Sequence, residues 1–152
     1  MTNRYLKELA NIHTVYEAAN RLDPGPLKAA IEGATARSAV MVGSGGSFSV
    51  ASFAAYIHQF RTGRLASPST PLDYMTLPLR DAAVMCFTAS GRNKDICAAF
   101  DEAAQREAKP LVGIVMREHS PLHELAEHYK YSRIISASST LFEDGVLAVA
   151  SL

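Results

Sequence analysis

The feature that most limits the possible folds is the alternation of short apolar segments with longer helical patterns. Each apolar run is as long as a buried strand and too short for a helix. These runs cover residues 38–42, 83–87, 111–116 and 132–136. The spacing of apolar residues predicts helices after the first three runs, to about Phe60, over 93–107 and over 120–128. Such repeated units predict a parallel sheet covered by helices on both faces.

The remaining segments complete this expectation. We predict an amphipathic helix over 3–22, a short helix over 27–34, a polar connection over 61–71, a short strand over 72–75 and a helix over 141–152. The expected fold is therefore an α/β three-layer α/β/α sandwich whose mostly parallel sheet has about five strands. Residues 1–36 are expected to form an N-terminal helical segment that packs on the domain or on a dimer partner, and residues 37–152 form the domain.

Charge and composition exclude several classes of function. Fifteen basic and fifteen acidic side chains cancel, so no net field attracts nucleic acid or an anionic membrane. The longest apolar runs are far shorter than the roughly 20 residues that a membrane-spanning helix needs. Cys86 and Cys97 lack a metal-type or redox-type spacing, so we expect free thiols in a reducing compartment. The sequence therefore predicts a cytoplasmic protein that binds neither nucleic acid nor membrane.

A glycine-rich turn, Gly43-Ser44-Gly45-Gly46-Ser47, follows the first apolar run and leads into a helix. Glycines let the backbone approach a ligand closely, and a helix start presents N–H groups and positive dipole. This arrangement favours an anion such as phosphate. The turn does not match the Rossmann fingerprint, the P-loop or the Gly-x-Ser-x-Gly elbow. A simple turn in which Ser47 caps the helix is the alternative.

A second polar loop follows the run at 83–87. Thr88, Ser90 and Asn93 supply short hydrogen-bonding side chains around Gly91, and Arg92 and Lys94 in the same loop add positive charge. In a parallel sheet both loops lie beyond the carboxyl ends of strands, where α/β proteins bind their ligands. We therefore expect the two loops to converge on one phosphate. A helix cap with solvated flanking charges explains the second loop equally well.

The two loops resemble the sugar isomerase (SIS) domain of phosphosugar isomerases and phosphosugar-binding regulators. The matching segments begin at Gly43, Phe87, Lys109 and Ser136 and span most of the chain. The second loop is the most specific, because the family has Ser-x-Ser-Gly-x-Thr where this chain has Thr-Ala-Ser-Gly-Arg-Asn. The resemblance implies a three-layer domain that binds the phosphate of a sugar phosphate. The implied contacts are Ser47, Thr88, Ser90 and Asn93, with Ser138 and Ser139 near the sugar.

Aldose–ketose isomerisation requires a base that moves a proton between adjacent carbons. The catalytic candidates are Glu143, which follows the Ser138-Ser139-Thr140 segment, and His58. Each candidate also has a purely structural interpretation. Glu143 would be a carboxylate in the first turn of a helix, where the helix dipole favours negative charge, and His58 would lie on the outer face of its helix. Sedoheptulose-7-phosphate isomerases, which the first loop resembles, carry a histidine and a glutamate where this chain has Phe53 and Ile57. Their metal-dependent chemistry is therefore not expected.

The histidine cluster at 119–128 suggests a metal site at first sight. It lacks the His-Glu-x-x-His order, and Pro121 interrupts the spacing of His119 and His123. The cluster also matches the Ser-Pro-Leu-Ala segment of the family, which is a structural helix start. We therefore expect neither a metal ion nor a cofactor.

These observations predict a sugar-phosphate-binding SIS domain of a phosphosugar isomerase or amino-sugar converting enzyme. The apolar helical pattern of 145–152 has no polar cap, so we expect a domain that is truncated or half of a tandem. It is expected to form a homodimer or to pair with a tandem SIS domain. The main alternative is a non-catalytic phosphosugar-sensing regulatory domain, which the apolar residues Phe53 and Ile57 favour. A nucleotide-binding α/β domain is a weaker third possibility.

Overall fold

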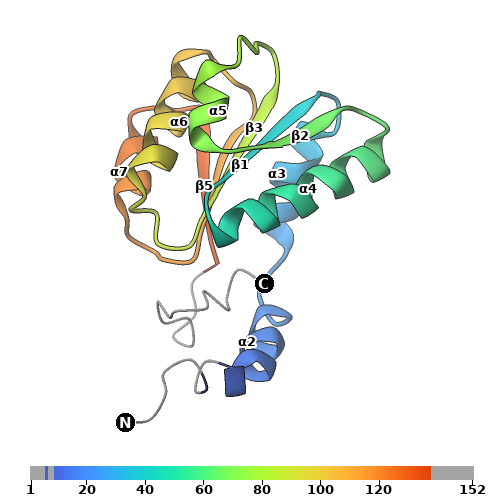
Figure 1. Ribbon diagram of the computed structural model, residues 1–152, viewed down its shortest axis with the longest axis vertical. Coiled ribbons are helices and arrows are strands. Elements are labelled where there is room, and N and C mark those ends of the chain that lie inside the picture. The colour runs from blue at the N-terminus through green and yellow to red at the C-terminus, as the bar shows by residue number, and fades with distance from the viewer. Residues whose placement is uncertain (1–5, 7–8, 138–152) are drawn as a thin grey trace.

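The computed structural model describes residue 6 and residues 9–137 (Figure 1). Strands and helices alternate along most of this range, as the apolar pattern predicts. In chain order the elements are α2 (Ile12–Ala19), α3 (Gly25–Ala34), β1 (Ala39–Gly43), α4 (Gly46–Thr62), β2 (Ala66–Ser69), α5 (Pro71–Thr76), β3 (Ala83–Thr88), α6 (Lys94–Gln105), β4 (Leu111–Val115), α7 (Pro121–Glu127) and β5 (Ser132–Ser136).

The strands form one five-stranded sheet in the order β2-β1-β3-β4-β5. All of its neighbouring strands are parallel, and Ala39 of β1 lies between Ala66 of β2 and Ala83 of β3. The chain moves from β1 to β2 in one direction across the sheet and from β3 to β5 in the other. The predicted α/β class and the predicted number of strands are confirmed. The reversal between β1 and β3 is the feature that positions the candidate site.

Helices cover both faces of the sheet, with α3 and α4 on one side and α5, α6 and α7 on the other (Figure 1). The side chains of β3 alternate between two cores, as a strand buried on both faces requires. Val84 and Cys86 belong to the core that contains Phe100 of α6. Met85 belongs to the core that contains Ala55 of α4. The result is the three-layer α/β/α sandwich that the sequence predicts.

The prediction for residues 61–75 is wrong in two places. The expected polar connection contains the edge strand β2, and the expected strand is the helix α5. Thr70 begins α5, because its hydroxyl oxygen accepts a hydrogen bond from the N–H of Asp73 at 3.2 Å and Pro71 occupies the first turn. β2 lacks an apolar pattern because it is short and half exposed, and an edge position tolerates Pro68.

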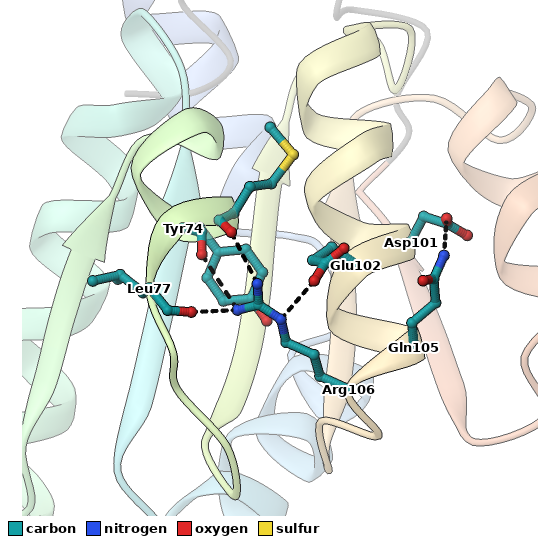
Figure 2. Close-up of polar contacts among 7 residues, drawn as sticks. Tyr74, Leu77, Asp101, Glu102, Gln105 and Arg106 are labelled. Atoms are coloured by element: carbon teal, nitrogen blue, oxygen red, sulfur yellow. Dashed lines mark hydrogen bonds and ion pairs between the residues drawn. The ribbon is translucent and has the colours of Figure 1, made fainter.

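Arg106, the residue after α6, links α6 to the end of α5 through hydrogen bonds. Its guanidinium donates to the carbonyl oxygens of Leu77 at 2.6 Å and Met75 at 2.9 Å (Figure 2). The guanidinium also pairs with Glu102 at 2.7 Å and lies 5.4 Å from the centre of the Tyr74 ring. The last carbonyl groups of a helix have no partner within it, so this one side chain satisfies several of them.

The two helices predicted in the N-terminal segment are confirmed in part. α3 lies where a short helix is expected, and α2 covers part of the second half of the helix expected over 3–22. Figure 1 shows α2 set apart from the sheet, and α2 exposes Ile12 and Tyr16. The helix expected over 141–152 lies outside the described residues. Within residues 9–137, none of the helices has the length and apolar character needed to cross a bilayer.

Candidate functional site

Two loops meet at the carboxyl edge of the sheet. One connects β1 to α4 and the other connects β3 to α6, and the register pairs Gly43 at the end of β1 with Phe87 of β3. Adjacent strands lie about 4.8 Å apart, so the loops are neighbours. The strand order also reverses between β1 and β3, which is where open α/β sheets bind ligands. The structure thus brings together the two segments that the sequence singles out.

Glycines shape the β1–α4 loop. A Cβ atom on Gly43 would lie 2.4 Å from the carbonyl oxygen of Ser47, so only glycine lets the strand pass so close to α4. Gly45 has a φ of 57° and is the N-cap of α4, and no side chain caps this helix. The alternative in which Ser47 is the cap is therefore wrong. The positive end of the α4 dipole faces the loop, beside the half-buried Ser44 and Ser47 and the exposed Gly46.

The β3–α6 loop is built on side-chain hydrogen bonds. The Thr88 hydroxyl accepts from the N–H of Gly91 at 3.3 Å, and the Ser90 hydroxyl accepts from the N–H of Arg92 at 3.2 Å. Each hydroxyl keeps its own proton, which it can donate to a ligand oxygen. Thr88 is buried, Ser90 is half-buried and Arg92 is exposed. The loop can therefore offer hydroxyl donors and a nearby positive charge to an anion.

Asn93 acts as the cap of α6. Its Oδ1 accepts from the N–H groups of Asp95 at 2.9 Å and Ile96 at 3.1 Å. The helix-cap interpretation of this residue, which the sequence leaves open, is confirmed. The Nδ2 group of the same side chain is the donor that Asn93 can offer to a ligand.

Gly91 holds the β3–α6 loop against the start of α7. It has a φ of 66°, and a Cβ atom there would lie 2.2 Å from Oγ of Ser120. The carbonyl oxygen of Gly91 accepts from the N–H of Leu122 at 3.2 Å. A third segment of the carboxyl edge, the β4–α7 connection, therefore fixes the position of the second loop.

A chain of three side chains extends from this contact to the end of β5. Oγ of Ser120 lies 2.8 Å from Nδ1 of His123, and Nε2 of His123 lies 2.8 Å from Oγ of Ser136. Burial and the neighbouring His119 lower the pKa of His123, and Glu127 opposes this shift. Sequence reasoning missed these contacts, because it treated Ser120 as a helix start and His123 as a rejected metal ligand. Their positions after β4 and at the end of β5 were the available signal.

His58 does not join the two loops. It lies about 12 residues after the start of α4, which corresponds to about 18 Å along a helix. Its Nε2 lies 3.0 Å from the carbonyl oxygen of Arg37, which precedes β1. His58 is only 5 % exposed, so the alternative in which it lies on the outer face is wrong. The other predicted residues near the sugar, Ser138, Ser139 and Glu143, lie outside the described residues.

An apolar groove of about 890 Å³ lies between α3, α4 and the sheet. Its lining includes Leu27 and Ile31 of α3, Phe53 and Ile57 of α4, and Met85 and Phe87 of β3. Phe53 is 66 % exposed although it is a large apolar side chain. The two positions at which the resemblance would place a histidine and a glutamate therefore carry apolar side chains that line this groove.

Over residues 9–137, three or more His, Cys, Asp or Glu side chains do not gather in a group that could hold a metal ion. Cys86 and Cys97 are free thiols. Burial raises the pKa of Cys86 to about 12, so its thiolate form is not populated near neutral pH.

Comparisons with known proteins establish the fold. No family model and no curated protein matches the chain. Among solved structures, the chain is similar to Vibrio vulnificus NanR complexed with ManNAc-6P, with 20 % identity and a TM-score of 0.65 over 96 % of this chain and 56 % of that one. A ligand complex of an Escherichia coli CFT073 protein matches with 19 % identity and a TM-score of 0.67 over 99 % of this chain and 84 % of that one.

A further similar structure is the tagatose-6-phosphate ketose/aldose isomerase from Escherichia coli, at 18 % identity and a TM-score of 0.63. The alignment covers 97 % of this chain and 42 % of that one. The chain thus spans about half of the length of the NanR and isomerase chains. These likenesses show that the chain has the SIS-type α/β/α fold that its two loops imply.

Proposed function

We propose that this chain is a sugar-phosphate-binding SIS domain whose ligand phosphate lies between the β1–α4 and β3–α6 loops. The observation that carries the proposal is the meeting of these loops at the β1/β3 switch, where α4 begins without a side-chain cap. A phosphate there would receive backbone N–H groups and helix dipole from one loop and hydroxyl groups from Thr88 and Ser90 of the other. The similar NanR structure is a complex with such a ligand, ManNAc-6P.

The domain is proposed to belong to a phosphosugar isomerase or an amino-sugar converting enzyme. One similar structure is described as a ketose/aldose isomerase and another as a glucosamine-6-phosphate deaminase. In the isomerase reaction a base removes a proton from one carbon and returns a proton to its neighbour, and Glu143 is our candidate for this base. The test is an isomerisation assay with fructose 6-phosphate, in which Glu143→Gln abolishes turnover and leaves ligand binding in place.

A second candidate function is the non-catalytic sensing of a phosphosugar. The observation that favours it is the apolar character of Phe53 and Ile57, which line the groove. A sensor binds the same ligand without turnover, so the isomerisation assay separates the two functions. Binding of fructose 6-phosphate without conversion, in wild type and Glu143→Gln alike, would favour the sensor.

We also propose that the domain pairs with a second SIS domain, either as a homodimer or as a tandem partner. The groove exposes a large apolar surface, and α2, which lies apart from the sheet in Figure 1, has exposed Ile12 and Tyr16 side chains. In this proposal residues 1–36 pack on the domain or on the partner. Sedimentation of wild type as a dimer and of Phe53→Asp as a monomer supports it, and a monomeric wild type would contradict the homodimer.

A cytoplasmic location completes the proposal. The two free cysteines fit a reducing compartment. Fractionation of the producing cells tests the location directly, and recovery of the protein from an extracellular fraction would contradict it.

A further inference from the structure

The most unusual polar arrangement at the carboxyl edge is the chain Ser120–His123–Ser136. An N-terminal serine of a helix normally uses its hydroxyl to accept from a backbone N–H of the first turn. Ser120 does not, because its hydroxyl lies against Nδ1 of His123 instead. The second ring nitrogen contacts Ser136, the last residue of β5. One imidazole therefore connects the start of α7 to the end of β5 through side chains alone.

The two ends of this chain have different surroundings. Ser120 is only 6 % exposed and packs against Gly91, which belongs to the loop proposed to hold the phosphate. Two hydrogen bonds hold that loop without His123, since the N–H of Leu122 donates to the carbonyl oxygen of Gly91 and the N–H of Gly91 donates to the Thr88 hydroxyl. Ser136 is exposed, and among its described contacts the hydrogen bond to His123 is the one that orients its hydroxyl. Removal of the His123 side chain is therefore expected to free the Ser136 hydroxyl at the end of β5 and to leave the β3–α6 loop in place.

β5 is two strands away from β3 in the sheet, which is about 10 Å. A sugar whose phosphate contacts the β3–α6 loop can extend past the end of β4 toward β5. An oriented hydroxyl at the end of β5 can therefore reach a hydroxyl of the sugar, whereas inorganic phosphate held at the β3 loop cannot touch it.

We propose that His123 is a positioning residue that holds Ser136 toward the sugar part of the ligand and so sets the preference for sugar phosphate over inorganic phosphate. This inference rests on the proposed function.

The test measures the dissociation constants of fructose 6-phosphate and inorganic phosphate by calorimetry for wild type, His123→Ala and Ser136→Ala. We expect both variants to lose roughly tenfold in affinity for fructose 6-phosphate, the effect of one hydrogen bond, and to keep their affinity for inorganic phosphate. His123→Gln places an amide nitrogen near the Nε2 position and is expected to recover most of the loss. His128→Ala, at an exposed position after α7, is the matched control and is expected to bind as wild type does.

The possible failures are distinguishable. An unchanged ratio of the two affinities in both variants, or an equal loss for both ligands, would overturn the role of His123 and leave the proposed function intact. A wild type that binds neither ligand, or that binds fructose 6-phosphate no more tightly than phosphate, would overturn the proposed function and this inference with it. If His123→Ala does not fold, Ser136→Ala and His123→Gln carry the test.

Discussion

Gly91 and Ser120 are packed so closely that a Cβ atom on Gly91 would lie 2.2 Å from Oγ of Ser120. Gly91 also has a φ of 66°, which side-chain-bearing residues rarely adopt. The contact joins the β3–α6 loop to the start of α7, and these are segments that follow two neighbouring strands. The position of the candidate phosphate loop therefore depends on the absence of a side chain at residue 91.

We expect Gly91→Ala to lower the free energy of unfolding by about 2 kcal/mol or more, from backbone strain and the clash with Ser120 together. Gly63→Ala is the matched control, since Gly63 has a φ of 67° but open space around the added carbon. It is expected to cost only the strain, about 1 kcal/mol. Urea unfolding followed by circular dichroism measures both. Equal losses would show that the contact with Ser120 does not constrain the loop.

Ser90→Ala is expected to weaken the binding of a sugar phosphate by about 1 to 3 kcal/mol, because a hydrogen bond to a charged group is lost. The stability of the free protein should change little, since the Ser90 hydroxyl contacts the N–H of Arg92 in an exposed loop. Calorimetric titration of wild type and variant gives the difference. An unchanged affinity would remove Ser90 from the site.

Arg106→Met is expected to destabilise the protein by about 2 to 3 kcal/mol. The substitution removes the donors that Leu77 and Met75 accept from at the end of α5, and those carbonyl oxygens lose their partner (Figure 2). Lys28→Met provides the control, because Lys28 pairs with Glu32 at 3.9 Å on the surface and such pairs contribute little. Thermal and urea unfolding compare the two. If Arg106→Met lowers the free energy of unfolding no more than Lys28→Met does, the hydrogen bonds of Arg106 to the end of α5 do not stabilise the protein.

The thiol of Cys86 is expected to be inert in the native state. Burial raises its pKa to about 12, so the reactive thiolate is absent near pH 8 and reagent access is blocked as well. A thiol reagent at pH 8 should modify Cys86 only after unfolding. Mass mapping of the modified peptides identifies the reacting residue. Rapid modification of Cys86 in the folded protein would show that the core opens around β3.

The lowered pKa of His123 predicts a pH dependence of stability. The unfolded chain takes up a proton on this imidazole at a higher pH than the native protein, so unfolding gains protons as the pH falls. The contribution of His123 to the free energy of unfolding is fully present above the ordinary histidine pKa of about 6.5. This contribution declines as the pH falls from there through the lowered pKa of His123 in the native protein. The difference in the free energy of unfolding between wild type and His123→Gln should therefore shrink as the pH is lowered. A difference that grows on acidification would contradict a lowered pKa of His123 in the native protein.

The sequence predicted the buried strands well because apolar runs leave few alternatives. It failed at β2 and α5, since an edge strand needs no continuous apolar pattern and the start of α5 depends on Thr70, Pro71 and Asp73 together. Thr70 followed by Pro71 is a typical helix start, but the short apolar segment at 72–75 suggested a strand.

The two candidate loops were also predictable, because glycine, serine and threonine at strand ends carry a strong signal. The chain Ser120–His123–Ser136 was not, since it joins residues from separate segments that only the parallel order of β4 and β5 brings together. His58 shows the opposite case. Its position after the glycine-rich turn suggested a place in the site, but the length of α4 carries it to the other edge of the sheet.

The β1–α4 and β3–α6 loops are proposed to hold the phosphate of a sugar phosphate. The most direct measurement is the thermal shift of the wild-type chain with hexose and pentose phosphates, the matched unphosphorylated sugars and nucleotides, because a ligand of the native state raises the unfolding temperature. We predict a shift with a sugar phosphate, none with the unphosphorylated sugar, and a smaller shift in Ser90→Ala. A shift with nucleotides that exceeds every sugar phosphate, or no shift with any phosphate compound, would contradict the account.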